Sequence, residues 1–304
     1  MKTTLALLFA CATLVAVNAW WQTGHMLVAQ VAKQDLLARY PNVYKRAEDL
    51  ALVLKGKTNN LSDTFVESAI WMDDIKPDGW NALENWHYTD RPYNPLGLSV
   101  DPLPQYTSEY AVQQAIKVLN NSKTRGQDTL AKSIFIRVLA HVIGDIHQPL
   151  HSAQLFNLSY PKGDMGGNLE KVFVTSTNQT LALHAFWDAV AFKVPNDFAR
   201  PLDASNMSIV EGIAKNLTDE FPRQAFQEQL SKKNVSDWTV DAYLDAVKYV
   251  YNPLRTDFVI DEAYQQQAWD LCRRNIALGG YRLADTIYDS LRLEVPSAFR
   301  GFRG

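Results

Sequence analysis

The stretch HVIGDIHQPLH, residues 141–151, holds three of the six histidines of this 304-residue chain. It closes a segment with helically spaced apolar residues, DTLAKSIFIRVLAHVIGDIHQ at 128–148, which predicts a long helix with Asp128 as its N-cap. Pro149 should end or kink that helix. The stretch therefore predicts an α-helix whose C-terminal end is rich in titratable side chains.

The positions of these side chains on the helix suggest a metal site. His141 and Asp145 lie one turn apart on one face, and His147 falls on the opposite side. After Pro149, His151 can turn back toward the first two. Two imidazoles and a carboxylate that converge are typical of a zinc site. The alternative is a core helix with one hydrogen-bonded histidine and a second that the C-terminal helix dipole favours.

Helical spacing dominates the rest of the chain. The segments that predict helices are 24–40, 64–75, 108–121, 128–148, 208–221, 240–254 and 261–294, the last as one or two helices around Gly279–Gly280, with Asp261 as N-cap. Only KVFVTSTNQTLAL, 171–183, predicts a β-hairpin, and proline-rich segments at 92–104 and 161–167 predict loops. The expected fold is a mostly α, single-domain bundle of long helices with one short hairpin.

The remaining histidines also have carboxylates or a free terminus near them. His184 and Asp188 are spaced for one helical face, and WMDD with Asp73 precedes ENWHY with His87. His25 follows Trp20 by five residues. These donors are too many for one four-coordinate zinc, so they predict a cluster of metal ions.

The N-terminus predicts a signal peptide at 1–19, with a short basic region, an apolar stretch and a small-residue cleavage site at Val17–Ala19. Cleavage would make Trp20 the mature N-terminus; the alternative is a single membrane anchor. Seven N-x-S/T sequons support a secreted, N-glycosylated product. Cys272 would be the single cysteine of the mature chain and is expected to be a buried apolar residue.

The charge balance argues against binding nucleic acid through a basic surface. Lys and Arg total 30 and Asp and Glu total 33, a formal net charge of −3. If phosphates are bound, something other than a Lys/Arg patch must attract them.

Taken together, the motifs resemble one family. Trp20-x4-His25, W-x-D at Asp73, W-H-Y-x-D at His87, the 141–151 stretch, Gly166-Gly167-Asn168 and L-H-x2-W-D at His184 occur in the order seen in the class I nucleases. These are trinuclear-zinc, single-strand-specific nucleases and 3′-nucleotidases of fungi, plants and protists, related in fold to bacterial zinc phospholipase C. The quoted motifs span 20–188, and the C-terminal third matches only as helices.

The resemblance implies three zinc sites. The first takes Asp73, His87, His141 and Asp145. A close partner site takes Asp145 as a bridging carboxylate, His25, and the α-amino nitrogen and carbonyl oxygen of Trp20. A third takes His151, His184 and Asp188. His147 is left to pack or to support a ligand.

The same resemblance implies the chemistry. Six positive charges from zinc against three ligating aspartates make a positive pocket in a net-negative protein. Asp73 and Asp145 would act in catalysis through a metal-activated water, and the third zinc would stabilise the 3′-oxyanion, which gives a 5′-phosphate product.

Four residues are predicted to bind substrate, each with a plainer alternative. Lys76 matches a phosphate contact or is a solvated helix lysine. Tyr88 and Asp90 match a base-stacking ring and a base-contacting carboxylate, although Tyr88 could instead pack in the core beside Trp86. Asn168 holds the hairpin near the site or makes a turn.

The sequence therefore predicts a secreted zinc endonuclease that cleaves single-stranded DNA and RNA and hydrolyses 3′-nucleotides, with residues 20–304 as one nuclease domain. We expect a monomer with no stable protein partner and no membrane association. The alternatives are a zinc phospholipase C and a non-catalytic, zinc-stabilised glycoprotein. The segment RPYNPLGLSVDPLPQY, 91–106, lacks the cysteines that fungal and plant members carry there, so base preference does not transfer.

Overall fold

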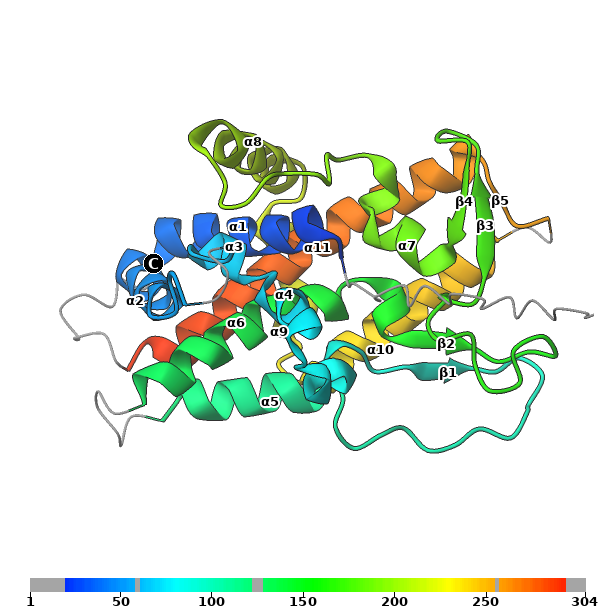
Figure 1. Cartoon of the computed structure of the whole chain (residues 1–304), viewed down its shortest axis with the longest axis horizontal. Coiled ribbons are helices and arrows are strands. Elements are labelled where there is room, and N and C mark those ends of the chain that lie inside the picture. The colour runs from blue at the N-terminus through cyan, green and yellow to red at the C-terminus, as the bar shows by residue number, and fades with distance from the viewer. Residues whose placement is uncertain (1–19, 58–60, 122–127, 255–256, 294–304) are drawn as a thin grey trace, which may run out of the picture.

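A computed structural model of the chain describes residues 20–57, 61–121, 128–254 and 257–293 (Figure 1). The predicted signal peptide, 1–19, lies outside these residues, as does the sequon asparagine at 60. The fold is mostly α, as predicted. Within the described ranges no helix is both long and apolar enough to span a lipid bilayer.

The helices are α1 (Gln22–Arg39), α2 (Pro41–Leu52), α3 (Phe65–Ser68), α4 (Trp71–Asp74), α5 (Ser108–Leu119), α6 (Thr129–Ile146), α7 (Leu183–Asp188), α8 (Ala204–Glu220), α9 (Gln227–Ser231), α10 (Val235–Asp245) and α11 (Glu262–Leu291). The strands are β1 (Arg91–Tyr93), β2 (Ala153–Leu155), β3 (Lys171–Val174), β4 (Gln179–Ala182) and β5 (Val259–Ile260). A 3-10 turn covers Pro149–His151, and α10 runs on into a π-helix at Ala246–Tyr251.

Helices α1, α6 and α11 form the centre of the bundle and pack on one another (Figure 1). Helix α11 is continuous through Gly279–Gly280, which decides between the one-helix and two-helix predictions. A Cβ at Gly280 would lie 2.4 Å from Val31 Cγ1 of α1, so the glycine allows close helix contact rather than a break.

Asp261 caps α11 as predicted, since its carboxylate accepts from the Tyr264 amide at 2.9 Å. Asp128 precedes α6, but its side chain makes no capping hydrogen bond and pairs with Lys132 instead.

The segment predicted as one helix at 64–75 is two short helices, α3 and α4. Thr64 caps α3, and its hydroxyl also bonds to Glu67. The chain then turns, and the Asp73 amide donates to Ile70 instead of Ala69. The Ala69 carbonyl is thereby left to accept a hydrogen bond from His141 of α6. The break in the helix serves a long-range contact.

The β-structure exceeds the single predicted hairpin. Strands β3 and β4 form that hairpin, antiparallel as expected, and β5 adds to β3 in parallel. Strands β1 and β2 form a separate parallel pair with Arg91 opposite Ala153. The pair begins where the Thr89 amide donates to the His151 carbonyl at 2.8 Å. It therefore joins the segment after His87 to the segment after α6.

Candidate metal centre and adjoining pocket

Helix α6 presents His141 and Asp145 on one buried face, as the spacing predicted. His141 Nδ1 donates to the Ala69 carbonyl at 2.6 Å, which leaves Nε2 with a free lone pair when the ring is neutral. Between the two residues, Gly144 lies against His25 of α1. A Cβ at Gly144 would come within 2.7 Å of His25 Nδ1, so the absence of a side chain there lets His25 reach the site.

Asp145 lies between two sets of donors. Its Oδ1 is 3.2 Å from His25 Nε2, and its Oδ2 is 3.1 Å from His87 Nδ1. His141 Nε2 lies 2.9 Å from His87 Nδ1. Asp73 Oδ1 completes this side at 3.8 Å from each of those two imidazole nitrogens. One carboxylate thus faces both groups, which is the arrangement of a bridging ligand.

Several of these buried atoms lack an ordinary hydrogen bond. Both ring nitrogens of His25 and Oδ1 of Asp145 are fully enclosed and make none with correct geometry. A buried polar atom without a partner is costly, and a cation held between His25 Nε2 and Asp145 Oδ1 would satisfy these two facing atoms. The donor set fits a metal ion.

A second group gathers His151, His184 and Asp188. His151 Nδ1 donates to the His87 carbonyl at 2.9 Å, and His184 Nδ1 donates to the Gly166 carbonyl at 2.7 Å. Their Nε2 atoms are 3.1 Å apart. Two ligands of a tetrahedral zinc are separated by about 3.3 Å, so this separation fits a shared cation.

Asp188 completes this group and is held by a neighbour. Its Oδ2 lies 3.3 Å from His184 Nε2, and its Oδ1 accepts from Gln148 Nε2 at 2.6 Å. An amide donor of this kind fixes a carboxylate's direction without competing for its charge. Burial raises the pKa of Asp188 well above its usual value, so without a cation this carboxyl would resist ionisation.

Burial keeps most of the clustered imidazoles neutral. It lowers the pKa of His25 and His87 to about 4 and that of His184 to about 3, and it also lowers the pKa of His151. For His141 the burial effect is outweighed by the carboxylates of Asp145 and Asp73, and its pKa is raised. Neutral imidazoles at pH 7 are metal ligands, because the lone pair is free.

Trp20 lies against both groups. Its indole is fully buried and donates to the Gly144 carbonyl at 2.8 Å. The following amide, of Trp21, donates to the Asp188 carbonyl at 2.9 Å. The Trp20–Trp21 peptide therefore lies between the ends of α6 and α7, the helices that carry Asp145 and Asp188.

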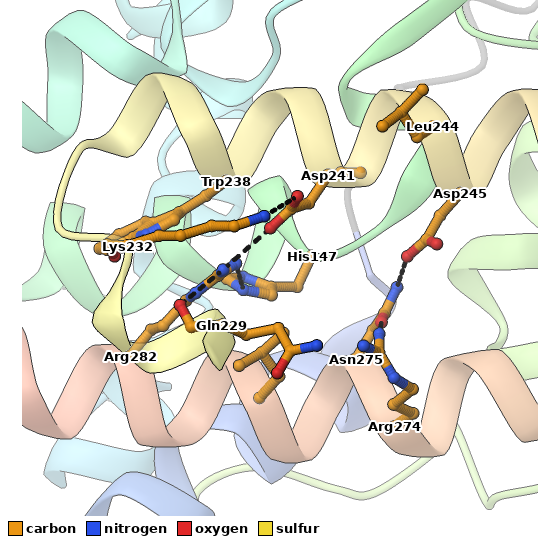
Figure 2. Close-up of a pocket in the computed structure, with 12 residues that line it drawn as sticks. His147, Gln229, Lys232, Trp238, Asp241, Leu244, Asp245, Arg274, Asn275 and Arg282 are labelled. Atoms are coloured by element: carbon orange, nitrogen blue, oxygen red, sulfur yellow. Dashed lines mark hydrogen bonds and ion pairs between the residues drawn. The ribbon is translucent and has the colours of Figure 1, made fainter. Parts of the chain in front are cut away.

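His147, which directly follows α6, points away from the donors, as expected from the helical spacing. Figure 2 shows it beside Arg282 and Trp238, in a cavity of about 170 Å³ between α10 and α11. Nδ1 donates to the Ile143 carbonyl at 2.7 Å, and Nε2 accepts from Arg282 Nη1 at 3.0 Å. Burial and the Arg282 charge lower its pKa to about 3. Because each ring nitrogen makes a hydrogen bond, His147 has no lone pair left for a metal ion, and it helps to pack α6 against α11.

A pocket of about 90 Å³ opens beside the donor groups and brings together all four predicted substrate residues. Its lining comprises Lys76, Glu84, His87, Tyr88, Asp90, Leu150, His151, Met165, Asn168 and His184. Residues from four separate segments of the chain therefore meet at one opening next to the imidazoles.

The structure argues against the plainer alternatives for Lys76, a solvated lysine, and for Tyr88, core packing beside Trp86. Lys76 is not a solvated lysine, since its side chain is 15% exposed and its Nζ lies 2.7 Å from Asp73 Oδ1. Tyr88 does not pack in the core with Trp86, whose ring contacts Tyr110 and Phe135 instead. The Tyr88 hydroxyl donates to Asn85 Oδ1 at 2.7 Å, and burial with nearby carboxylates raises its pKa to about 12.

The other two pocket residues are also placed by local bonds. Asn168 donates to the Met165 carbonyl at 2.8 Å, so it makes the turn and lines the pocket as well. Burial, together with the nearby Asp164 carboxylate, raises the pKa of Asp90 well above its usual value. Glu84 and Met165, which also line the pocket, were not predicted from the sequence. Glu84 lies in a 3-10 helix, Asn81–His87, and Met165 in a turn, and the position of each depends on distant contacts.

Comparison with known proteins identifies the family. A family model described as S1/P1 Nuclease matches residues 20–292. The chain belongs to this family. Endonuclease 4 of Arabidopsis thaliana is 24% identical over 293 residues, 88% of each chain. Nuclease S1 of Aspergillus oryzae is 24% identical over 285 residues, which cover 87% of this chain and 89% of that protein.

Membership of the S1/P1 nuclease family makes the chain a nuclease, a hydrolase of phosphodiester bonds in nucleic acid. The family match begins at Trp20 and continues to residue 292. It therefore includes α8 to α11, the C-terminal third in which the sequence offered no motif. Three buried His/Asp groups that could hold metal ions lie within the same match.

Proposed function

We propose that this nuclease is a secreted, zinc-dependent endonuclease that cleaves single-stranded DNA and RNA to 5′-phosphate products and also hydrolyses 3′-nucleotides. The observation that carries the proposal is the Asp145 carboxylate, which faces His25 with one oxygen and His87 with the other. Beside it opens a pocket lined by a lysine, a tyrosine and two more donors of the predicted substrate set. Metal donors and substrate contacts are thus adjacent.

Three zinc ions would be held by nine residues. The donors are Trp20, His25, Asp73, His87, His141, Asp145, His151, His184 and Asp188. Zinc bound there would lower the pKa of water to about 7 and neutralise charge on the reacting phosphate. Asp73 and Asp145 would take part by holding and orienting the ions. The carbonyls of Ala69, His87 and Gly166 fix three imidazoles in the tautomer that offers Nε2.

The pocket residues bind the substrate next to these ligands. Lys76, which is tied to Asp73, supplies a positive charge for the phosphate. Tyr88 offers a ring face for stacking a base, and Asp90 and Asn168 offer polar atoms for its edge. Stacking needs an unpaired base, which accounts for a preference for single strands.

Secretion and maturation form part of the proposal. Removal of residues 1–19 would convert the Trp20 nitrogen from an amide, a poor ligand, to an amine. None of the six described sequon asparagines is buried, so each is accessible to a glycan in the folded protein; they are Asn120, Asn157, Asn178, Asn206, Asn216 and Asn234. We expect the mature enzyme to be a monomer.

The test measures metal content and substrate range on the mature protein. Zinc per chain would be determined by elemental analysis, followed by hydrolysis of single- and double-stranded DNA, RNA, a 3′-mononucleotide and phosphatidylcholine. About three zinc ions with turnover of single strands are expected. Turnover of the lipid alone would establish a phospholipase C, and three zinc ions without turnover would establish a non-catalytic glycoprotein.

A matched pair of variants ties the activity to the site. Asp145→Asn removes the shared carboxylate and should lose metal and nearly all hydrolysis. Asp78→Asn, an exposed position just after Lys76, should change neither. Equal activity of the two variants would reject Asp145 as the shared ligand.

A further inference from the structure

The turn GDMGGN, residues 163–168, has a left-handed backbone at three glycines and at Met165, and only Met165 pays a steric cost for it. Gly163, Met165, Gly166 and Gly167 have φ of 91°, 55°, 61° and 80°, the left-handed region that side chains disfavour. A turn that contains such a conformation at Met165 needs surrounding contacts to persist.

This turn contributes directly to the site. The Gly166 carbonyl accepts the His184 Nδ1 hydrogen, and Met165 and Asn168 line the pocket. A Cβ at Gly166 would lie 2.6 Å from the Leu150 carbonyl, so the turn is pressed against the segment that carries His151. A shift of this turn would move both the His184 ring and one wall of the pocket.

Asp164 anchors the turn to β2. It is fully buried, and its Oδ1 accepts from the Leu155 amide at 2.8 Å. Its own amide donates to the Leu155 carbonyl at 3.0 Å, and its carbonyl accepts from the Leu169 amide at 3.1 Å. The residue thus holds both sides of the turn with one side chain and its backbone.

The Tyr251 hydroxyl bonds to this buried carboxylate. It lies 2.9 Å from Oδ2 and 3.2 Å from Oδ1 of Asp164, and Tyr251 is 8% exposed. Tyr251 ends the π-helix, a wide-turn geometry that often occurs at functional sites. Its contact with Asp164 connects the C-terminal third of the chain, which lacks motifs, to the rim of the pocket.

We propose that Tyr251 and Asp164 are positioning residues of this enzyme: the hydroxyl orients the carboxylate, which holds the 163–168 turn against β2. The turn then fixes His184 through the Gly166 carbonyl and keeps Asn168 at the pocket. This inference rests on the proposed function, since it assigns Tyr251 to the His151–His184–Asp188 metal group and to the nucleotide pocket. The Asp145 metal group does not contact this turn through any of these bonds.

The test compares Tyr251→Phe, Asp164→Asn and the double variant, with Tyr93→Phe as the matched control. The Tyr93 hydroxyl donates to Asn252 Oδ1 at 2.8 Å, and its ring lies 5.8 Å from that of Tyr251, so the control removes a neighbouring hydroxyl that does not touch the turn. Zinc retained per chain would be measured against graded chelator. Melting temperature, and kcat and KM on a 3′-mononucleotide, would be measured alongside.

Tyr251→Phe should release one of three zinc ions at a chelator concentration about tenfold lower than wild type does, and its KM should rise by about the same factor. The reason is that lost support of a ligand typically weakens metal binding by about 10- to 100-fold. The other two ions should be retained as in wild type. The double variant should be no worse than Asp164→Asn alone, since both residues act through one bond. Tyr93→Phe should match wild type.

Unchanged zinc retention and KM in Tyr251→Phe would overturn the inference. So would additive effects in the double variant, or a parallel loss of all three ions with a lower melting temperature. Wild-type protein that hydrolyses no nucleotide would instead reject the proposed function. The zinc-retention comparison needs no turnover and would still decide the role of Tyr251.

Discussion

At the scale of single residues, a missing side chain is as important as a ligand. Gly144→Ala should displace His25, because the new Cβ would lie 2.7 Å from Nδ1 in a fully buried site. We expect zinc retention to fall by at least about tenfold, as for other changes that disturb a ligand's orientation. Gly212→Ala on α8 is the control, since nothing lies within 4 Å of its Cβ and it should stabilise the helix by about 0.5–1 kcal/mol. Chelator titration and thermal unfolding distinguish the two.

His141 lies on α6 and His147 directly follows its last residue, and the two should respond differently to substitution. His147→Asn removes the imidazole that accepts from Arg282 Nη1, although Arg282 Nη2 still donates to Gln229 and Asp241, and it should cost about 1–3 kcal/mol of stability without loss of metal. His141→Asn should lose metal from the Asp145 group. Urea unfolding and elemental analysis check both variants; metal loss in His147→Asn would contradict the assignment.

At the scale of elements, Arg200 connects the start of α1 to α4. Its guanidinium donates two bonds to Asp74, the neighbour of Asp73, at 2.8 and 2.6 Å, and its Nε donates to Gln22 Oε1 at 3.1 Å. Arg200→Lys cannot reproduce this planar set and should cost about 1.5–3 kcal/mol in urea unfolding.

The exposed pair Lys215–Asp219 on α8 provides the comparison for Arg200. The two side chains are 67% and 61% exposed, so Lys215→Ala should change stability by less than about 1 kcal/mol. Equal losses in the Lys215 and Arg200 variants would show that the buried arginine does not hold α4 in place.

The sequence predicted helices well where a long apolar stripe faces the core, as in α1, α6 and α11. It failed where tertiary contacts decide. Helix α2 was not predicted, although Pro41 at its first position favours a helix start. At the break between α3 and α4 the Ala69 carbonyl accepts from His141, which is far away in sequence. Strands β1 and β2 have three residues each, too few for a periodic signal, and exist because they pair with each other.

At the scale of the whole molecule, the predicted donors converge because each is tied to a helix or an adjoining turn of the same bundle. Their residue types and spacing were readable from the sequence. The supporting residues were not, since Tyr251, Asp164 and Arg200 act through contacts that span 80 residues or more. Glu84 and Met165 reach the pocket only once the loops are placed.

The whole site should make the metal-free protein sensitive to acid. His25, His87, His151 and His184 have pKa values lowered by burial, so the unfolded chain binds more protons than the folded chain below about pH 6.5. Stability should therefore fall as pH decreases from about 6.5 toward 4, by up to about 1.4 kcal/mol per pH unit for each ring. The raised pKa values of His141, Asp188 and Asp90 oppose this trend, and the lowered pKa of His147 adds to it. Urea unfolding of chelator-treated protein at pH 7 and pH 5 checks it, and equal stability would contradict it.

Removal of the proposed signal peptide should complete the site chemically. An extra residue before Trp20 turns its amine into an amide, which is a poor zinc ligand. Because the Trp20 indole is buried against Gly144, the added residue also has to be accommodated beside α6. We expect the extended protein to lose one zinc ion of the Asp145 group and most activity, while the same residue added after Gly304 changes neither. Metal content measured for both proteins decides the point, because three retained zinc ions in the extended protein would exclude the amine as a ligand.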